Sequence, residues 1–215
     1  MLRAPLARLV LAVLILLAAP TPPVIPRARA SAAGADAAET IARVERYLNG
    51  ITTLRADFIQ VADDGADAKG VLYIARPGRL RVQYAPPSKV VMVSNGAWLT
   101  YIDGAGGQVS QLPLDRTPAG ILVAKDIRLG DAIQVDGVEH AAQVTRVTLR
   151  RAESPDEGSI TLTFTDQPFE LRQWTVIDPQ GFRTRITLYN LRKGLVIDPK
   201  LFDAPPPPPE SGSGR

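Results

Sequence analysis

The sequence contains no cysteine and only one histidine, His140. The lack of cysteine excludes a disulfide scaffold, a thiolate nucleophile and a Cys-ligated zinc or iron–sulfur site. One histidine offers a single candidate base, and the sequence holds no Gly-x-Ser-x-Gly, His-Glu-x-x-His or Gly-x-x-x-x-Gly-Lys motif. We therefore expect no enzyme, no metal and no cofactor, with a paired-carboxylate hydrolase as an unfavoured alternative.

An excess of charge of one sign is also lacking. The chain has 25 basic and 22 acidic residues, but four basic ones (Arg3, Arg8, Arg27, Arg29) lie in the first 30 residues, which hold no acid. The remainder, with 21 basic and 22 acidic residues, is nearly neutral, so nucleic acid is not an expected partner. The body of the chain also has a group of basic residues that could contact a partner protein, could contact lipid head groups, or could simply be solvated on a sheet face. These residues are Lys69, Arg76, Arg79, Arg81 and Lys89.

No apolar run is long enough to cross a bilayer. The longest, residues 9–19, has eleven residues, whereas a spanning helix needs about 20. Arg3 and Arg8 precede it, and a proline-rich stretch and the small-x-small tripeptide Ala28-Arg29-Ala30 follow it. This order is typical of a signal peptide, here residues 1–30, and predicts export as a soluble protein. An uncleaved membrane anchor is the alternative.

The exported part divides into three stretches. Residues 31–38 are small and predict a flexible lead-in, residues 39–203 form one domain, and residues 204–215 are a Pro/Gly/Ser-rich tail that we expect to be disordered. The domain opens with apolar residues at the spacing of one helical face: Ile41, Val44, Leu48 and Ile51. Gly50 supplies the end of this helix.

Short runs with period-two alternation and β-branched or aromatic residues follow the helix. The first series predicts strands at 54–61, 70–75, 80–84, 89–94, 97–102 and 108–112, and the second at 143–151, 159–165, 171–178, 182–190 and 196–197. Asn95-Gly96 is the strongest hairpin signal between them. Residues 117–125, with Thr117 as cap and Pro118 in the first turn, predict a short apolar helix. The pattern indicates a mainly β, α+β protein with one curved antiparallel sheet or barrel.

Two polar features resemble functional sites only superficially. Residues 63–67 are as acidic as a calcium loop, but they lack its closing glutamate and occupy a predicted hairpin turn, which favours a solvated turn. His140 follows Glu139 in a predicted loop and is interpreted as a surface residue.

The amount of apolar surface is large for a single sheet. Residues 71–74, 90–93 and 98–102 are apolar at nearly every position, as if both faces of the sheet were covered. One interpretation is a filled core, as in a scaffold or interaction protein. The other is a concave sheet that encloses an apolar cavity beneath the two helices. Such a cavity would suit an acyl chain, since burial is worth about 0.8 kcal/mol per methylene group.

Residues 76–87 match the run Arg-Pro-Gly-x-x-Arg-x-x-Tyr-x-x-Pro. In this run the chain resembles the family of the periplasmic outer-membrane lipoprotein carrier LolA. The likeness continues through residues 93–96, 117–118, 173–181 and 201–202, and covers about residues 38–203.

The resemblance implies an unclosed antiparallel β-barrel covered by a helical lid. It also implies a monomeric periplasmic carrier whose cargo is acylated lipoproteins, received from an inner-membrane lipoprotein-releasing ABC transporter and passed to the outer membrane, where an acceptor is possible. A periplasmic carrier or sensor of another lipid on the same scaffold is the alternative.

The resemblance also implies roles for residues. Arg76 corresponds to the arginine that holds the lid closed by hydrogen bonds to carbonyl groups of the lid helices; an ordinary solvated charge at a strand end is the alternative. Leu80, Val82 and Tyr84 share one strand face by parity and should look into the cavity. We expect the acyl-binding cavity to be lined by Leu72, Ile74, Leu80, Val82, Tyr84, Val91, Val93, Ile121, Leu122, Val123, Phe164 and Trp174.

Overall fold

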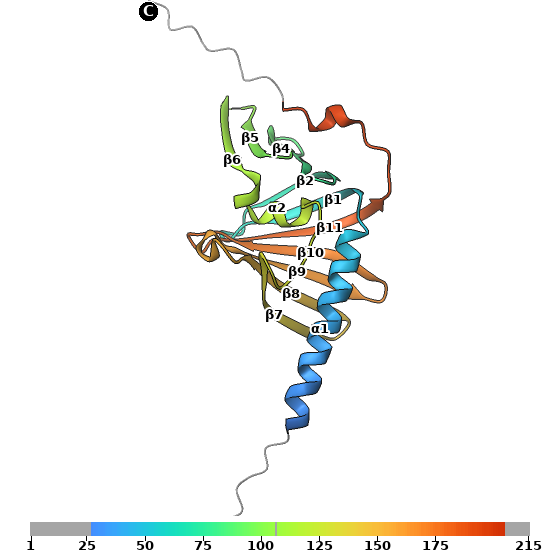
Figure 1. The fold of residues 1–215 in the computed structure, drawn as a ribbon. Helices are drawn as coiled ribbons and strands as arrows, with labels where there is room; N and C mark the ends of the chain where they lie inside the picture. The colour runs from blue at the N-terminus through green and yellow to red at the C-terminus, as the bar shows by residue number, and fades with distance from the viewer. Residues whose placement is uncertain (1–26, 106, 205–215) are drawn as a thin grey trace, which may run out of the picture.

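The computed structural model describes residues 27–105 and 107–204 (Figure 1). Most of the predicted signal peptide, residues 1–26, and the predicted disordered tail from residue 205 onward lie outside the described residues. The helices are α1 (Arg27–Asn49) and α2 (Pro118–Val123), with the 3-10 turns η1 (Leu114–Arg116), η2 (Pro155–Glu157) and η3 (Pro199–Phe202). The strands are β1 (Thr53–Val61), β2 (Asp67–Ala75), β3 (Arg79–Tyr84), β4 (Val90–Asn95), β5 (Trp98–Asp103), β6 (Gln108–Pro113), β7 (Ile133–Ala141), β8 (Val144–Arg151), β9 (Ser159–Asp166), β10 (Phe169–Ile177) and β11 (Arg183–Lys193).

Within the described residues, the strands form one eleven-stranded sheet in the order β6-β5-β4-β3-β2-β1-β11-β10-β9-β8-β7. All neighbouring strands are antiparallel. The chain winds outward from β1 to β6, passes through α2, and returns from β7 to β11 beside β1. Because β6 and β7 are the two ends of the order, the sheet curls without closing, and the helices lie in its concavity (Figure 1). This confirms the predicted fold class.

Helix α1 is longer than the sequence pattern indicates. It begins at Arg27, so residues 31–38 are helical and not the flexible lead-in that we predicted. The physical reason lies in the composition: five of these eight residues are alanine, which has the highest helix propensity. The predicted end is confirmed, since α1 stops at Asn49 and the amide of Gly50 bonds the carbonyl of Arg46 at 3.0 Å.

Helix α2 begins as its sequence predicts but ends at Val123, two residues before the predicted end at Lys125. The Thr117 hydroxyl oxygen accepts a hydrogen bond from the amide of Gly120 at 3.2 Å, and Pro118 occupies the first helical position. Ile121, Leu122 and Val123 are all buried, so the short helix presents an apolar underside to the sheet.

Two local predictions are wrong. His140 lies on strand β7 and not in a loop; a register shift between Val135 and Gly137 interrupts the alternation that would have revealed this edge strand. Val196 and Ile197 are outside all strands. They follow Gly194, which has a φ of 72°, and Ile197 packs against a small apolar cluster on the outer face of the sheet.

The segment from Leu195 to Asp203 crosses that outer face. Phe202 is buried against Ala75 and Val93. The guanidinium of Arg81 donates a hydrogen bond to the carbonyl of Leu201 at 3.1 Å, and that of Arg79 lies 5.9 Å from the centre of the Phe202 ring. Two of the basic residues noted in the sequence therefore hold the C-terminal segment on the sheet.

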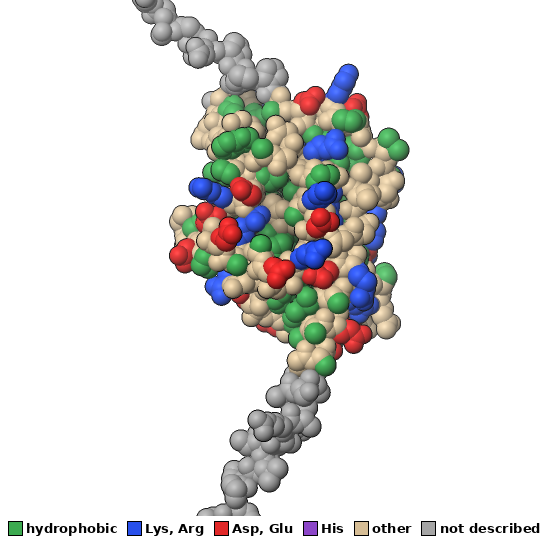
Figure 2. All heavy atoms as spheres, in the orientation of Figure 1, with side chains coloured by type: hydrophobic (Ala, Val, Ile, Leu, Met, Phe, Trp, Pro, Cys, Tyr) green, Lys and Arg blue, Asp and Glu red, His purple; other side chains and the backbone are tan. Residues whose placement is uncertain are grey.

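Charges of both signs are interspersed on the face of the molecule shown in Figure 2. This surface offers no continuous basic stripe of the kind that binds nucleic acid.

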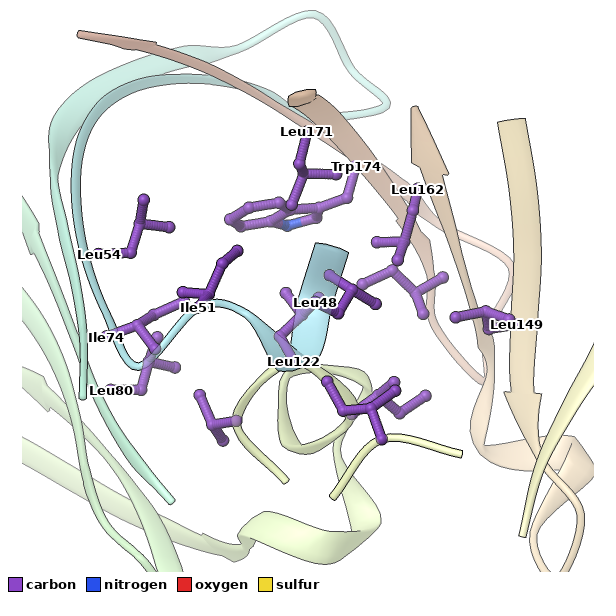
Figure 3. Packing of buried hydrophobic residues seen from close by; sticks show 14 of the residues in the cluster. Leu48, Ile51, Leu54, Ile74, Leu80, Leu122, Leu149, Leu162, Leu171 and Trp174 are labelled. Atoms are coloured by element: carbon purple, nitrogen blue, oxygen red, sulfur yellow. The ribbon is translucent and has the colours of Figure 1, made fainter. Parts of the chain in front are cut away.

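The main core lies between the concave face of the sheet and the two helices. Its members come from both halves of the sheet, with Leu54, Ile74 and Leu80 on one side and Leu149 and Leu162 on the other (Figure 3). Leu48 and Ile51, at and just after the end of α1, and Leu122 of α2 point into the space between them (Figure 3). The helices thus cover the apolar face of the sheet, and we call α1 and α2 together the lid.

Candidate functional site

One arginine connects the sheet to both lid helices. Arg76 follows β2, and its Nε donates to the carbonyl of Ala124 at 2.8 Å. Its Nη1 donates to the carbonyl of Leu48, and its Nη2 donates to the carbonyl of Lys125 at 2.9 Å and to Oδ1 of Asn49 at 3.0 Å. A single guanidinium group therefore joins the C-terminal end of α1 to the chain that leaves α2.

The Arg-Pro-Gly sequence places this side chain. The amide of Arg76 bonds the carbonyl of Thr52 at 2.8 Å, and the amide of Gly78 bonds the carbonyl of Val123 in α2 at 2.7 Å. Gly78 has a φ of +74°, and a Cβ at this position would lie 2.6 Å from the Cα of Gly96. Only glycine allows this turn to lie so close to the next one.

The electrostatic setting favours the bonds of Arg76. Carbonyl groups at the C-terminal end of a helix carry partial negative charge, and they attract a cation. Burial lowers the pKa of Arg76, and the carboxylate of Asp126 acts in the opposite direction. The guanidinium group stays protonated at neutral pH, as arginine does throughout proteins. Its bonds are therefore charge-assisted, worth about 1.5–3 kcal/mol where both partners are shielded from water.

A second set of contacts holds α1 to the segment after α2. Asn49 donates from Nδ2 to the carbonyl of Ile127 at 2.9 Å and accepts on Oδ1 from the amide of Ile127 at 3.0 Å. Glu45 accepts from the amide of Leu129 at 2.5 Å. Neither Asn49 nor Glu45 stands out in the sequence. Their partners lie 78 and 84 residues further along the chain, and no local pattern announces such pairings.

Ten of the predicted cavity residues lie in the main core. Eight of them are buried members of the core cluster, and Val82 and Tyr84 are partly buried and pack against it. The ring of Tyr84 meets that of Phe58 edge-on at 5.4 Å, and its hydroxyl donates to Oε1 of Gln60 at 2.6 Å. Burial raises the pKa of Tyr84. The ten are Leu72, Ile74, Leu80, Val82, Tyr84, Ile121, Leu122, Val123, Phe164 and Trp174.

The other two predicted cavity residues, Val91 and Val93, differ from expectation. Val93 packs against Phe202 on the outer face of the sheet, and Val91 has the same parity on β4. Met92 is the β4 residue that faces the core, opposite Val82 of β3. Since residues 90–93 are all apolar, alternation along β4 gives no indication of which two face inward.

The interior is filled by its own side chains in this state. Phe164 and Leu162 of the sheet and Val44 and Val123 of the lid have no exposed surface. Space for a guest therefore requires the lid to move away from the sheet.

Comparisons with known proteins agree with this architecture. The family model of the outer membrane lipoprotein carrier protein LolA matches residues 49–205. An outer-membrane lipoprotein carrier protein of Methylococcus capsulatus is 29% identical over 175 residues, which cover 77% of this chain and 83% of that protein. One of Pseudomonas aeruginosa is 27% identical over 188 residues, which cover 82% and 89%.

A solved structure shares the fold. A DUF1329 family protein from Desulfovibrio piger superposes with a TM-score of 0.50 at 11% identity, over 78% of this chain and 96% of that one. In the part of the chain that the structure describes, no helix has both the length and the hydropathy of a membrane span. With most of its length matched by the family model, the chain belongs to the LolA family of outer membrane lipoprotein carrier proteins.

Proposed function

We propose that this protein carries acylated lipoproteins across the periplasm and shields their acyl chains between the concave sheet and the lid. The single observation that carries the proposal is the position of Arg76, which ties both lid helices over an apolar sheet face. The names of the relatives support the choice of cargo. Carriage needs no chemistry, in agreement with a sequence that has no catalytic motif.

The energetics of such a carrier follow from the filled interior. A bound acyl chain gains about 0.8 kcal/mol per methylene group that leaves water. It must also displace the contacts that the lid makes with the sheet, including those of Leu48 and Leu122. The net affinity is the difference between these terms, so it is far smaller than the gross gain. A modest net affinity allows the cargo to be passed on.

The route of the cargo belongs to the same proposal. Residues 1–30 direct the chain to the periplasm, where it acts as a monomer. An inner-membrane lipoprotein-releasing ABC transporter supplies the cargo together with the energy for lid opening. The outer membrane, through an acceptor or directly, receives it.

Native mass spectrometry of the mature protein, purified from the periplasm of a Gram-negative host, tests the proposal. We expect a fraction of the protein to carry acylated lipoprotein, to be identified after denaturation. Bound phospholipid alone would favour a carrier of another lipid. If the mass is that of the protein alone and a fluorescent acyl probe also fails to bind, the carrier proposal is wrong.

A further inference from the structure

A charged residue lies on the apolar face of the sheet at the rim. Arg151 ends β8, where it shares the inward face with Val147 and Leu149, both with no exposed surface. Across the sheet it pairs with Ile133, another core residue. Its neighbour Arg150 points the other way and forms an ion pair with Asp136 at 2.9 Å.

Arg151 lies against the lid helix α2. A Cβ on Gly120 would come within 2.9 Å of Nη2 of Arg151 and 2.3 Å of the carbonyl oxygen of Leu114. The absence of a side chain at Gly120 therefore makes room for the guanidinium group. Among the described residues, the buried Nε of Arg151 has no hydrogen-bond partner.

The group lines a small pocket that is bounded by both apolar and charged residues. Ile121, Leu149 and Ile160 form its apolar part, and Arg116 and Glu157 line it beside Arg151. The buried Oε2 of Glu157 also lacks a partner among the described residues. The space measures about 10 Å³, roughly the room that one water molecule needs. A larger guest fits only when α2 moves.

The chemistry of the pocket selects the kind of guest. A buried donor without a partner is costly, and an incoming acceptor removes that cost. An anion would be attracted by Arg116 and Arg151 but repelled by the carboxylate of Glu157, whereas a neutral carbonyl oxygen accepts from Arg151 without that penalty. Beyond the carbonyl, hydrocarbon would lie against the apolar residues of the pocket. An ester or amide at the head of an acyl chain has this combination of groups.

We propose that Arg151 donates a hydrogen bond to the ester or amide carbonyl at the head of a bound acyl chain, and so fixes how deeply the chain enters beneath α2. The inference rests on the proposed carrier function and adds to it the recognition of the acyl linkage. The two arginines differ in this respect: the donors of Arg76 are already bonded to the lid, whereas the buried Nε of Arg151 has no partner among the described residues.

Two synthetic ligands test the assignment: a lipopeptide with an S-[2,3-bis(palmitoyloxy)propyl]cysteine, and its analogue with two hexadecyl ether chains, which lacks the ester carbonyls. Arg151→Met keeps an unbranched side chain that reaches about as far as the arginine Nε, and it removes all the donors. We expect it to weaken diester binding about tenfold or more, the size of one charge-assisted hydrogen bond. Diether binding should stay within about twofold, and Arg151→Lys should restore part of the diester affinity.

Arg146→Met is the matched control, since Arg146 lies on the same strand but faces outward. It should leave both affinities unchanged. The assignment would be overturned if Arg151→Met lost affinity equally for the diester and the diether, or lost no affinity for the diester. It would also be overturned if the variant selectively lost affinity for an alkylphosphocholine, a ligand that has a phosphate but no acyl carbonyl. If Arg151→Met fails to fold, the wild-type preference for diester over diether and its reduction in Arg151→Lys decide the question. Failure of the wild-type protein to bind either ligand would instead overturn the carrier function.

Discussion

Replacing Arg76 by leucine is expected to leave the protein folded but to trap its cargo. The change removes the charge-assisted bonds to Leu48, Ala124 and Lys125 that favour the closed lid. Closure of the lid competes with the bound acyl chain, so a weaker closed state means tighter binding and slower release. A loss of about 2–3 kcal/mol from the closed state corresponds to release slowed roughly 30-fold or more. The measurement is the rate at which labelled lipoprotein passes from the carrier to acceptor membranes.

Two further variants separate the geometry of Arg76 from its charge. Arg76→Lys keeps the charge but loses the planar fork that reaches both helix ends, so we expect an intermediate transfer rate. Arg185→Leu removes an exposed arginine from the outer surface of β11 and should transfer at the wild-type rate. Transfer at the wild-type rate by Arg76→Leu would remove this residue from the mechanism.

The second large effect is on stability. Phe164 is fully buried; its ring stacks on that of Phe169 at 4.7 Å and meets Tyr47 of α1 edge-on at 5.5 Å. Phe164→Ala leaves a cavity at the point where α1 rests on the sheet, with an expected cost of about 3–5 kcal/mol. The melting temperature should fall by roughly 10 °C, as measured by calorimetry or circular dichroism.

Phe182→Ala provides the control for this substitution. The Phe182 side chain is 61% exposed, and its truncation should change the free energy of unfolding by no more than about 0.5 kcal/mol. If Phe164→Ala and Phe182→Ala lowered the free energy of unfolding by similar amounts, the contact between α1 and the sheet would not be a main source of stability.

Much of the fold could be predicted because local signals agree with one another. Thr117 and Pro118 start α2, Gly50 ends α1, and the turn at Asn95-Gly96 joins two apolar runs that pair as β4 and β5. These signals depend only on neighbours in the sequence. The strand order depends on the whole chain and was not predicted. The residues alone left a filled core and a concave sheet beneath two helices as alternatives, and the unclosed barrel with a helical lid was what the family resemblance implied.

The candidate site could be predicted only in part. Arg76 belongs to a recognisable motif, but Asn49 and Glu45 bond backbone groups far along the chain, and their types suit many surface positions. On β4, where every position of 90–93 is apolar, the choice of inward face rests on pairing with β3. For Arg151 the charge itself is misleading, since a charged residue at the end of a strand is expected to face solvent and not the core.

The most direct test of the account asks whether an acyl chain enters the space between the sheet and the lid. Trp174 is 9% exposed and lies in the core, whereas Trp98 is 48% exposed. In the variant Trp98→Phe, Trp174 is the one remaining tryptophan. A lipopeptide with brominated acyl chains should quench its fluorescence as it binds, with the same saturation as binding measured by an independent method, and its unbrominated counterpart should not. Saturable binding of the brominated ligand that leaves the fluorescence of Trp174 unchanged would contradict the proposal that the lid opens to admit acyl chains.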